Sequence, residues 1–247
     1  LRVLIKGFKA DVVHSHMIHA NLLSRLVRLT AKVPKLVCTA HSNNEGGKLR
    51  MLAYRLTDKL ANISTNVSEE AVKAFIKAGA VKSGRMVSVT NGIDTNRFVF
   101  DTKARDEKRI ELNIDNLQII LAVGRLDKPK DYPNLLNSIA LLKEWRQDFK
   151  VFIAGDGPLK KELLTLTKNL KIESFVEFLG VQRDIPALMT ANDIFVLSSA
   201  WEGFGLVVAE AMACERITVA TDCGGVAEIM GDKGFLVKPR NNNNRRR

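Results

Sequence analysis

The chain alternates short apolar runs with longer segments in which apolar residues recur every three or four positions. The short runs are rich in Val, Ile and Leu and predict buried strands, whereas the longer segments predict amphipathic helices. Strands are expected at residues 11–16, 36–41, 63–67, 86–90, 117–123, 151–154, 176–179, 194–198, 217–220 and 235–237. Helices in the first half are expected at residues 20–29, 48–60 and 69–78. Such an alternation is typical of parallel sheets covered by helices, so we expect an α/β fold.

One break interrupts this alternation near residues 95–115. Asn91-Gly92 is a turn signal, and residues 102–109 are densely charged with almost no apolar periodicity. We therefore expect two Rossmann-like, doubly wound parallel-sheet domains. They are assigned to residues 1–100 and 117–240, with a linker at 101–116 and a low-complexity tail of asparagines and arginines at 241–247. The first half opens in mid-element and the second stops at a strand, so we expect both domains to be incomplete and the chain to be the middle of a longer protein.

Composition narrows the class of protein. Of the 247 residues, 46% are hydrophobic, which is enough for a large core. No apolar run approaches the roughly 20 residues that a membrane span needs. The three cysteines are an odd number with no C-x-x-C pair, so neither a disulfide framework nor a structural zinc site is predicted, and the reducing cytosol is the expected compartment.

The net charge of +11 is concentrated in the first half of the chain. Residues 1–100 hold 16 basic and 6 acidic side chains, whereas the remainder holds 22 and 21. Such a field attracts anionic lipid, phosphorylated substrates or nucleic acid, unless the lysines only solvate the surface. The helix expected at 48–60 places basic residues beside leucines, which predicts peripheral association with an anionic membrane surface. Nucleic acid is not an expected partner, because the basic half lacks interleaved aromatic residues and a reader motif.

The densest group of candidate functional residues is AWEGFGLVVAEAMAC at 200–214, directly after an expected strand. A strand, a glycine-rich loop and a helix place backbone N–H groups where they can bind a diphosphate, and Gly203 and Gly205 allow close approach. Glu202 and Glu210 are carboxylates that can each accept two hydroxyl hydrogen bonds, which suits a sugar or a ribose. The alternative is a surface helix with incidental glutamates, although an unpaired charge in the apolar stretch around Glu210 would be costly.

The spacing E-x7-E of Glu202 and Glu210, with Gly-Phe-Gly between, resembles the donor site of the retaining family-4 glycosyltransferases of GT-B fold, or glycosyl transferases group 1. Further motifs occur in the order that the family has. They are VTNGID at 89–94, VGRL at 123–126, KDYP at 130–133 and GDGP at 155–158. The resemblance extends over nearly the whole chain. It implies a hexosyltransferase of GT-B fold that acts in polysaccharide biosynthesis.

The resemblance also implies roles for individual residues. Arg125 and Lys130 would hold the donor diphosphate, Glu202 would contact the transferred sugar, and Glu210 would bind the ribose hydroxyls. The donor loop would also include Gly203, Phe204 and Gly205. Physical chemistry agrees for the two cations, because a departing nucleoside diphosphate gains charge in the transition state and fixed cations then stabilise it more. For Lys130 alone, simple solvation is the alternative.

Four histidines lie at or just after expected strand ends in the first half of the chain. His41 matches the T-x-H position that lies beside the reacting sugar in related glycosyltransferases. His16 and His19 are candidates for lining the acceptor side. A metal site is not predicted, because only His14 and His16 share a strand face and no carboxylate or cysteine is near in sequence. A structural role at the strand ends stays open for these histidines.

The chain contains no D-x-D motif, so no metal cofactor is expected. A glycosidase would not need Arg125 and Lys130 at a diphosphate. We expect transfer of a hexose-type sugar from a UDP- or GDP-sugar to a glycan or lipid-linked acceptor. The resemblance implies retention of configuration, with the leaving phosphate accepting the proton. The alternatives are a sugar-nucleotide epimerase of the same fold and an inactive nucleotide-sugar-binding fragment.

Overall fold

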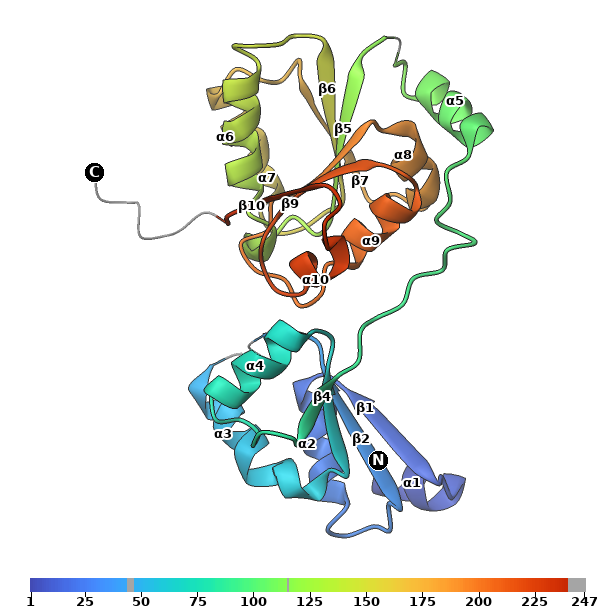
Figure 1. Cartoon of the computed structure of the whole chain (residues 1–247), viewed down its shortest axis with the longest axis vertical. Coiled ribbons are helices and arrows are strands. Elements are labelled where there is room, and N and C mark those ends of the chain that lie inside the picture. The colour runs from blue at the N-terminus through green and yellow to red at the C-terminus, as the bar shows by residue number, and fades with distance from the viewer. Residues whose placement is uncertain (44–46, 115, 240–247) are drawn as a thin grey trace, which may run out of the picture. The chain divides into compact units, whose positions relative to one another are not determined.

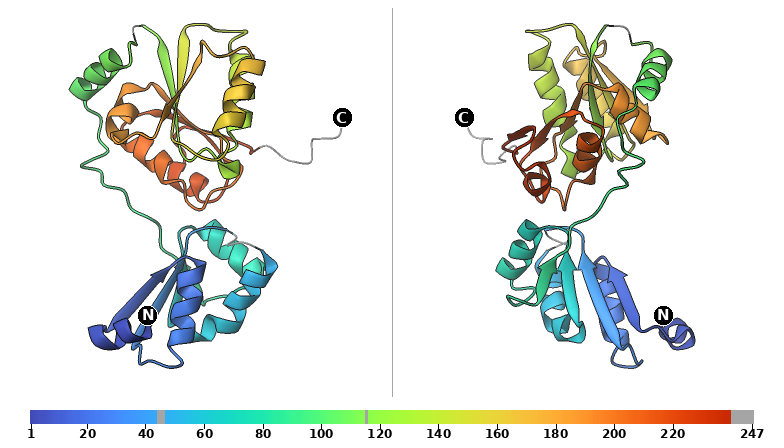
Figure 2. Two further views of the ribbon diagram at one scale, coloured as in Figure 1. Left: turned by 180° about the vertical axis from the view of Figure 1, so that it is seen from behind. Right: turned by 45° about the vertical axis from the view of Figure 1, so that its right-hand side comes forward.

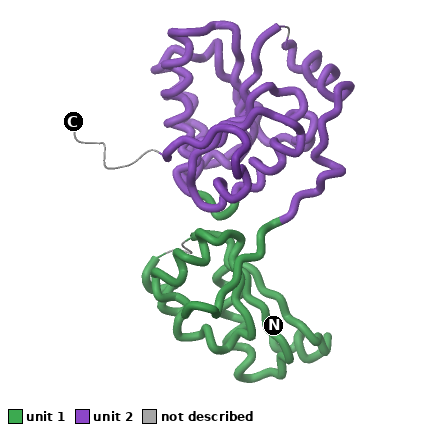
Figure 3. The backbone as a smooth tube through the Cα atoms, viewed as in Figure 1, with its two compact units in different colours: residues 1–91, 202–204 green, residues 92–201, 205–247 purple. Residues whose placement is uncertain are grey.

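The structure, a computed structural model, describes residues 1–43, 47–114 and 116–239. It divides into two compact units (Figure 3). The first comprises Leu1–Asn91 with Glu202–Phe204, and the second comprises Gly92–Trp201 and the chain from Gly205 onward. Each unit contains one parallel sheet, so the predicted α/β class with two parallel sheets is confirmed. The tail predicted at 241–247 lies outside the described residues.

The sheet of the first unit has four parallel strands in sequence order (Figure 1). They are β1 (Val12–His16), β2 (Lys35–Ala40), β3 (Ile63–Asn66) and β4 (Met86–Ser88). The connecting helices are α2 (Ile18–Val27), α3 (Lys48–Thr57), the 3-10 turn η1 (Asp58–Leu60) and α4 (Glu69–Lys77). Helix α4 starts at a good capping residue, because Ser68 Oγ accepts a hydrogen bond of 3.1 Å from Ala71 N–H. All four strands were predicted.

The sheet of the second unit has six parallel strands in the order β10-β9-β8-β5-β6-β7. They are β5 (Gln118–Val123), β6 (Phe149–Ala154), β7 (Val176–Gly180), β8 (Ile194–Leu197), β9 (Ile217–Thr221) and β10 (Phe235–Val237). The chain runs outward from β5 through β6 to β7 and then returns to pair β8 with β5, with Ile120 opposite Ile194. This reversal is a topological switch point. In such sheets ligands bind outside the carboxyl ends of the strands, at this switch point.

Helices cover both faces of the six-stranded sheet (Figures 1 and 2). One face carries α6 (Tyr132–Leu142) and α7 (Lys160–Asn169), whose apolar residues pack with Val151 and Ile153 of β6. The other face carries α8 (Ile185–Ala191), α9 (Leu206–Ala213) and α10 (Val226–Met230), which pack with Phe152 and Phe195. Successive side chains of β6 point to opposite faces of the sheet, so the core of the second unit has two layers.

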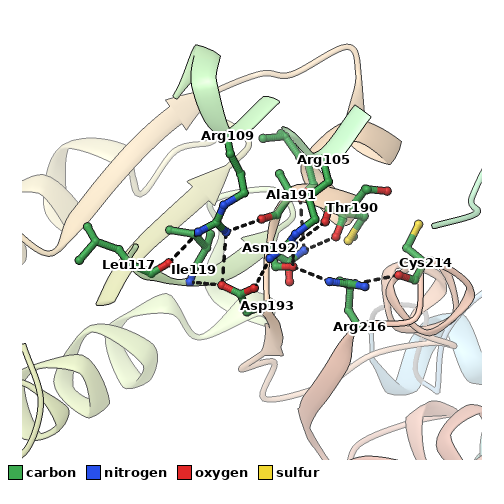
Figure 4. A network of polar contacts seen from close by, with 12 residues as sticks. Arg105, Arg109, Leu117, Ile119, Thr190, Ala191, Asn192, Asp193, Cys214 and Arg216 are labelled. Atoms are coloured by element: carbon green, nitrogen blue, oxygen red, sulfur yellow. Dashed lines mark hydrogen bonds and ion pairs between the residues drawn. The ribbon is translucent and has the colours of Figure 1, made fainter. Parts of the chain in front are cut away.

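The segment expected as a linker, residues 101–116, contains a helix that was not predicted. Helix α5 spans Thr102–Glu111 and buries none of its residues, which explains the missing apolar periodicity. Its contacts are polar instead (Figure 4): Arg105 and Arg109 both form ion pairs with Asp193, at the junction of α8 and β8. Asp101 caps the helix, because its Oδ1 accepts a hydrogen bond of 3.0 Å from Ala104 N–H.

A short helix that was not predicted, α1 (Arg2–Phe8), precedes the first predicted strand. Helix α7 begins at Lys160, two residues after the end of the GDGP motif. Within the described part of the chain, no helix is both long and apolar enough to span a bilayer.

Candidate functional site

The loops after β5 and β8 meet at the switch point of the second unit and hold each other in place. Ser198 Oγ donates a hydrogen bond of 2.8 Å to the carbonyl oxygen of Lys130, and Ala200 N–H donates one of 2.8 Å to the carbonyl of Pro129. Lys130 closes the 3-10 turn η2 (Lys128–Lys130). The loop after β8 therefore fixes the backbone of the turn that carries Lys130.

Two glycines of the loop after β6 allow that loop to pack closely against the loop after β5. A Cβ at Gly155, where φ is +139°, would lie 1.9 Å from the carbonyl oxygen of Gly124, and one at Gly157 would lie 2.4 Å from that of Leu126. No side chain fits at either position. Leu126 N–H also donates to the Asp156 carbonyl at 3.0 Å. The GDGP motif thus has a structural role, which is to bring the loop after β6 against the backbone on either side of Arg125.

The two predicted cations differ in their surroundings. The side chain of Arg125 is 72% exposed, and its Nε lies 3.5 Å from Asp127 Oδ2, a pair that contributes little energy at such exposure. The side chain of Lys130 packs against Gly124. A Cβ atom built on Gly124 would lie only 3.0 Å from Lys130 Cε. Both residues follow the carboxyl end of β5, as the sequence predicted. An exposed guanidinium and an ammonium on a fixed turn are suited to binding phosphate oxygens.

Helix α9 starts at the same edge of the sheet and carries Glu210. Gly205 is the residue before the helix and has φ of +91°, with Val226 Cγ2 only 2.9 Å from the position of a Cβ, so a larger residue would be strained there. Glu210 is half-buried. Burial raises the pKa of its carboxyl, and the positive charge of Arg97 acts in the opposite direction. The expected donor-binding residues of the second unit therefore lie at one edge of its sheet. They are Arg125, Lys130, Gly205 and Glu210.

The turn that begins at the end of the NGID motif carries Arg97, whose positive charge acts on Glu210. Asp94 Oδ1 accepts hydrogen bonds from the N–H groups of Asn96 at 3.0 Å and Arg97 at 3.2 Å, which folds residues 94–97 into a turn. Phe98, the next residue, is buried in the core of the second unit and anchors this turn. The electrostatic effect of Arg97 on Glu210 was not predicted from the sequence.

In the first unit, three histidines gather at the carboxyl ends of β1 and β2. His16 Nδ1 lies 2.9 Å from His41 Nε2, and His14 Nε2 lies 2.7 Å from Thr39 Oγ1. Burial, followed by the nearby charges of His16 and His41, lowers the pKa of His14. The structure thus brings His16 and His41 together. His19, on the exposed side of α2, makes no hydrogen bond or ion pair with any described residue.

Two backbone features accompany these histidines. Met17, between β1 and α2, has φ of 68° and ψ of 160°, a region that glycine normally occupies, and its N–H donates to the Thr39 carbonyl at 3.0 Å. Glu202–Phe204 group with this unit, where Ser68 Oγ donates to the Gly203 carbonyl at 3.2 Å. A Cβ at Gly203 would lie 2.1 Å from the His41 carbonyl oxygen, so this position requires glycine. Phe204 is buried and Glu202 is half-buried.

Several residues that shape these sites were not predicted. Ser198 and Thr221 lie at the carboxyl ends of neighbouring strands, and Thr221 Oγ1 donates to the Ser199 carbonyl at 2.5 Å. The signal that could have identified them is their place at strand ends beside the switch point. Among residues 1–43, 47–114 and 116–239, no group of three or more His, Cys, Asp or Glu side chains is arranged to hold a metal ion.

Comparison with known proteins gives matches over nearly the whole chain. A family model described as Glycosyl transferases group 1 matches residues 104–245, more than half of the chain. A second model, described as Glycosyltransferase Family 4, matches residues 1–97. The crystal structure of Anabaena HepE in complex with UDP-glucose superimposes with a TM-score of 0.87 at 26% identity and covers 96% of this chain and 67% of HepE. The predicted GT-B fold class is thereby confirmed.

Two curated relatives illustrate the range of similarity. The amylovoran biosynthesis glycosyltransferase AmsD of Erwinia amylovora is 28% identical over 231 residues, which are 91% of this chain and 61% of AmsD. The N-acetylgalactosamine-N,N'-diacetylbacillosaminyl-diphospho-undecaprenol 4-alpha-N-acetylgalactosaminyltransferase of Campylobacter jejuni is 40% identical over 129 residues, which are 51% of this chain and 34% of that protein. This chain spans less than two thirds of the length of these relatives.

Proposed function

The chain belongs to the glycosyl transferases group 1 family, and from this premise we propose that it transfers a hexose-type sugar from a nucleotide-sugar donor to a glycan or lipid-linked acceptor. The observation that carries the proposal is the edge of the six-stranded sheet at its switch point. There, the turn that bears Lys130 is fastened by Ser198, and Arg125 and Glu210 occupy the same edge. Cations for a diphosphate and a carboxylate for a diol are the groups that a nucleotide-sugar needs.

UDP is the proposed nucleotide of the donor. HepE, whose fold this chain shares at 26% identity, has been crystallised with UDP-glucose. We assign the diphosphate to Arg125 and Lys130 and the ribose hydroxyls to Glu210. Glu202, Gly203, Phe204 and Gly205 are assigned to the donor loop, with Glu202 at the transferred sugar. A GDP-sugar is the alternative donor.

The proposed reaction retains the anomeric configuration and needs no metal ion. The bond between the anomeric carbon and the donor phosphate oxygen breaks, and the acceptor oxygen bonds to the same face of that carbon. The departing β-phosphate takes the acceptor proton, so no protein nucleophile is required. Arg125 and Lys130 supply the positive charge that stabilises the departing diphosphate. His41 is assigned to the transferred sugar, and His16 and His19 to the acceptor side.

The proposed acceptor is a glycan built on a lipid diphosphate. The name of the Campylobacter relative refers to a diphospho-undecaprenol-linked sugar, and the name of AmsD refers to the biosynthesis of amylovoran. The surface of helix α3 is consistent with a membrane-bound substrate. Its Leu49, Leu52 and Leu56 are 83%, 49% and 75% exposed, and they lie beside a lysine and two arginines of the same helix. We therefore also propose peripheral association with an anionic membrane surface.

The test measures binding and turnover in the same protein. UDP, GDP and UDP-glucose are titrated calorimetrically against the chain, and release of UDP from UDP-glucose is followed with and without a diphospho-undecaprenol-linked sugar. The proposal predicts tighter binding of UDP than GDP and release of UDP that depends on the acceptor. Binding without turnover would indicate an inactive fragment, and acceptor-independent conversion of the donor sugar to its epimer would indicate an epimerase. Absence of nucleotide binding would contradict all three.

A further inference from the structure

A group of cations that the proposed function does not use lies at the amino-terminal edge of the sheet in the first unit. Arg28 follows α2, Lys59 belongs to η1, and Arg85 directly precedes β4. Together with residues 60–62 they line a polar hollow of about 510 Å³. The histidines described above lie at the carboxyl ends of β1 and β2, so this hollow is at the opposite edge of the sheet.

Two of the three cations are held in fixed positions by the backbone. Arg28 Nη1 donates to the Leu60 carbonyl at 2.8 Å, and its Nη2 donates to the Pro34 carbonyl at 3.3 Å. Arg85 Nη2 donates to the carbonyls of Asp58 at 2.8 Å and Ala61 at 3.0 Å. These bonds fix both guanidinium groups around residues 60–62. They leave Arg28 Nε and Arg85 Nη1 without a hydrogen bond to any described residue.

Positive charge exceeds negative charge among the described residues that line this region. A neighbouring hollow of about 520 Å³ shares Lys59 and Arg85 and adds Arg55 and Lys82. Of the described residues that line the two hollows, Asp58 is the only carboxylate. Its Oδ2 already pairs with Arg85 Nε at 3.0 Å, and its Oδ1 accepts from Ser64 Oγ at 3.3 Å. Like charges repel, so an arrangement of five cations around one engaged carboxylate favours binding of an anion.

We propose that the hollow between Arg28, Lys59 and Arg85 binds a phosphate group. Two positioned guanidinium donors with a flexible ammonium are the combination that recognises tetrahedral phosphate oxygens. A polar hollow of this kind suits an anion better than an apolar ligand. The site is separate from the donor site, and the inference holds whether or not the chain transfers a sugar.

Two sources can supply the phosphate group, and the structure suggests how to separate them. Leu56 lines the neighbouring hollow and is 75% exposed, which places an apolar side chain beside the cations. A phospholipid offers both a headgroup phosphate and an apolar region, whereas inorganic phosphate offers only the anion. Lipid binding would therefore depend on Leu56 as well as on the cations, and binding of free phosphate would depend on the cations alone.

The test is a titration of the whole chain with inorganic phosphate at constant ionic strength, followed by the backbone amide NMR signals of residues 60–62. Local signals distinguish this site from the donor site, where phosphate also has cations to bind. The variants are Lys59→Gln and Arg28→Gln, alone and combined, with Lys168→Gln on the exposed face of α7 as the control for removal of one charge elsewhere. In parallel, flotation with phosphatidylglycerol and phosphatidylcholine vesicles is measured for the same proteins and for Leu56→Ser.

The proposal predicts saturable shifts at residues 60–62, with affinity at least about tenfold lower in the combined variant and unchanged in Lys168→Gln. Preferential binding to phosphatidylglycerol that Leu56→Ser and the combined variant both weaken would identify a lipid headgroup as the source. Phosphate shifts without preferential flotation would identify a soluble phosphate. Absence of saturable shifts together with absence of preferential flotation would overturn the proposal, as would equal affinity in the parent and combined variant. Nucleotide binding at the donor site is measured separately, so either proposal can fail alone.

Discussion

Glu210 is a half-buried carboxylate in an apolar stretch of α9, and its charge state is central to its assigned role. An ionised carboxylate can accept hydrogen bonds from two neighbouring hydroxyls, whereas a protonated carboxyl presents a donor in place of one acceptor. Burial raises the pKa of Glu210, and the charge of Arg97 limits the rise. Protonation therefore begins at a higher pH than for an ordinary glutamate, whose pKa is 4.5.

Donor binding is expected to weaken on acidification. As the pH falls from 7.5 toward 4.5, the ordinary pKa of a glutamate, the parent chain should lose affinity for UDP-glucose, because the raised pKa of Glu210 means that this carboxyl is already being protonated. UDP-glucose is used since its diphosphate is a diester and does not titrate in this range. Glu210→Gln should bind more weakly at pH 7.5 and show a flatter pH dependence, measured by calorimetric titration. A parent and variant with parallel pH profiles would contradict the assignment of Glu210.

His41 is expected to affect turnover more than donor affinity. Its ring contacts His16, with Nε2 2.9 Å from His16 Nδ1, and we assign it to the transferred sugar. His41→Ala should lower kcat by about tenfold or more, as for loss of one stabilising contact in a transition state. The affinity for UDP should be little changed. A purely structural histidine would instead lower the melting temperature and leave turnover per folded molecule intact.

At the scale of single elements, α5 shows how a helix without an apolar face is held in place. Arg105 donates to the carbonyls of Thr190 and Asn192, each at 2.8 Å, and Arg109 donates to that of Ala191 at 3.0 Å. Both arginines pair with Asp193, which also accepts a hydrogen bond of 2.7 Å from Ile119 N–H. Asp193 therefore links α5 to the amino-terminal ends of β5 and β8.

Removal of this charge is expected to destabilise the second unit. Burial acts to raise the pKa of Asp193, but the Ile119 N–H, Arg105 and Arg109 together hold it below the ordinary value of 3.8. Asp193→Asn should lower the free energy of unfolding by about 1–3 kcal/mol near pH 7, measured by urea denaturation. A depressed carboxyl pKa stabilises the fold above the unfolded-state pKa, so the difference should shrink as the pH falls below 3.8.

The matched control is Asp148→Asn, which removes a carboxylate from a solvent-exposed pair with Arg146 on the same unit. Exposed pairs contribute little, so this change should be close to neutral. Equal destabilisation by the two substitutions, or a difference for Asp193→Asn that grows on acidification, would show that the polar contacts of α5 do not act as described.

The elements differ in how far the sequence could predict them, and the reason is local. The strand cores of β5 and β6 are β-branched apolar runs, and burial on both faces of a parallel sheet requires that composition. Helix α5 has no such pattern, because its stability depends on Asp193, more than 80 residues away in the chain. Helix periodicity carries no information on a contact of that kind.

The candidate site shows the same division. The spacing of the sequence singles out the glycines at 203 and 205 and the glutamates at 202 and 210 as candidates. The contact between Ser198 and Lys130 could not, because it depends on the pairing of β5 with β8, which the order of strands along the chain does not reveal. Likewise, the effect of the Arg97 charge on the pKa of Glu210 depends on how residues 94–97 fold and not on the spacing of a motif.

At the scale of the whole molecule, the excess of positive charge in the first 100 residues is expected to direct the chain to anionic membranes. The chain should sediment with vesicles that contain phosphatidylglycerol at low salt and much less with neutral phosphatidylcholine vesicles. Raising the salt concentration should reduce the difference, because surface charges are screened. Equal sedimentation with both vesicle types at low salt would contradict this expectation.

We propose that the edge of the six-stranded sheet binds a nucleotide-sugar through Glu210 and the loop that precedes it. This binding is tested by titration of UDP against the parent, Glu210→Gln, Glu202→Gln and the exposed control Glu162→Gln on α7. A hydrogen bond to a charged group contributes about 1.5–3 kcal/mol, so Glu210→Gln should weaken UDP binding about tenfold or more. Glu202→Gln and Glu162→Gln should leave UDP affinity within about twofold of the parent, because free UDP carries no sugar to contact Glu202. UDP binding by Glu210→Gln as tight as that of the parent would contradict the account.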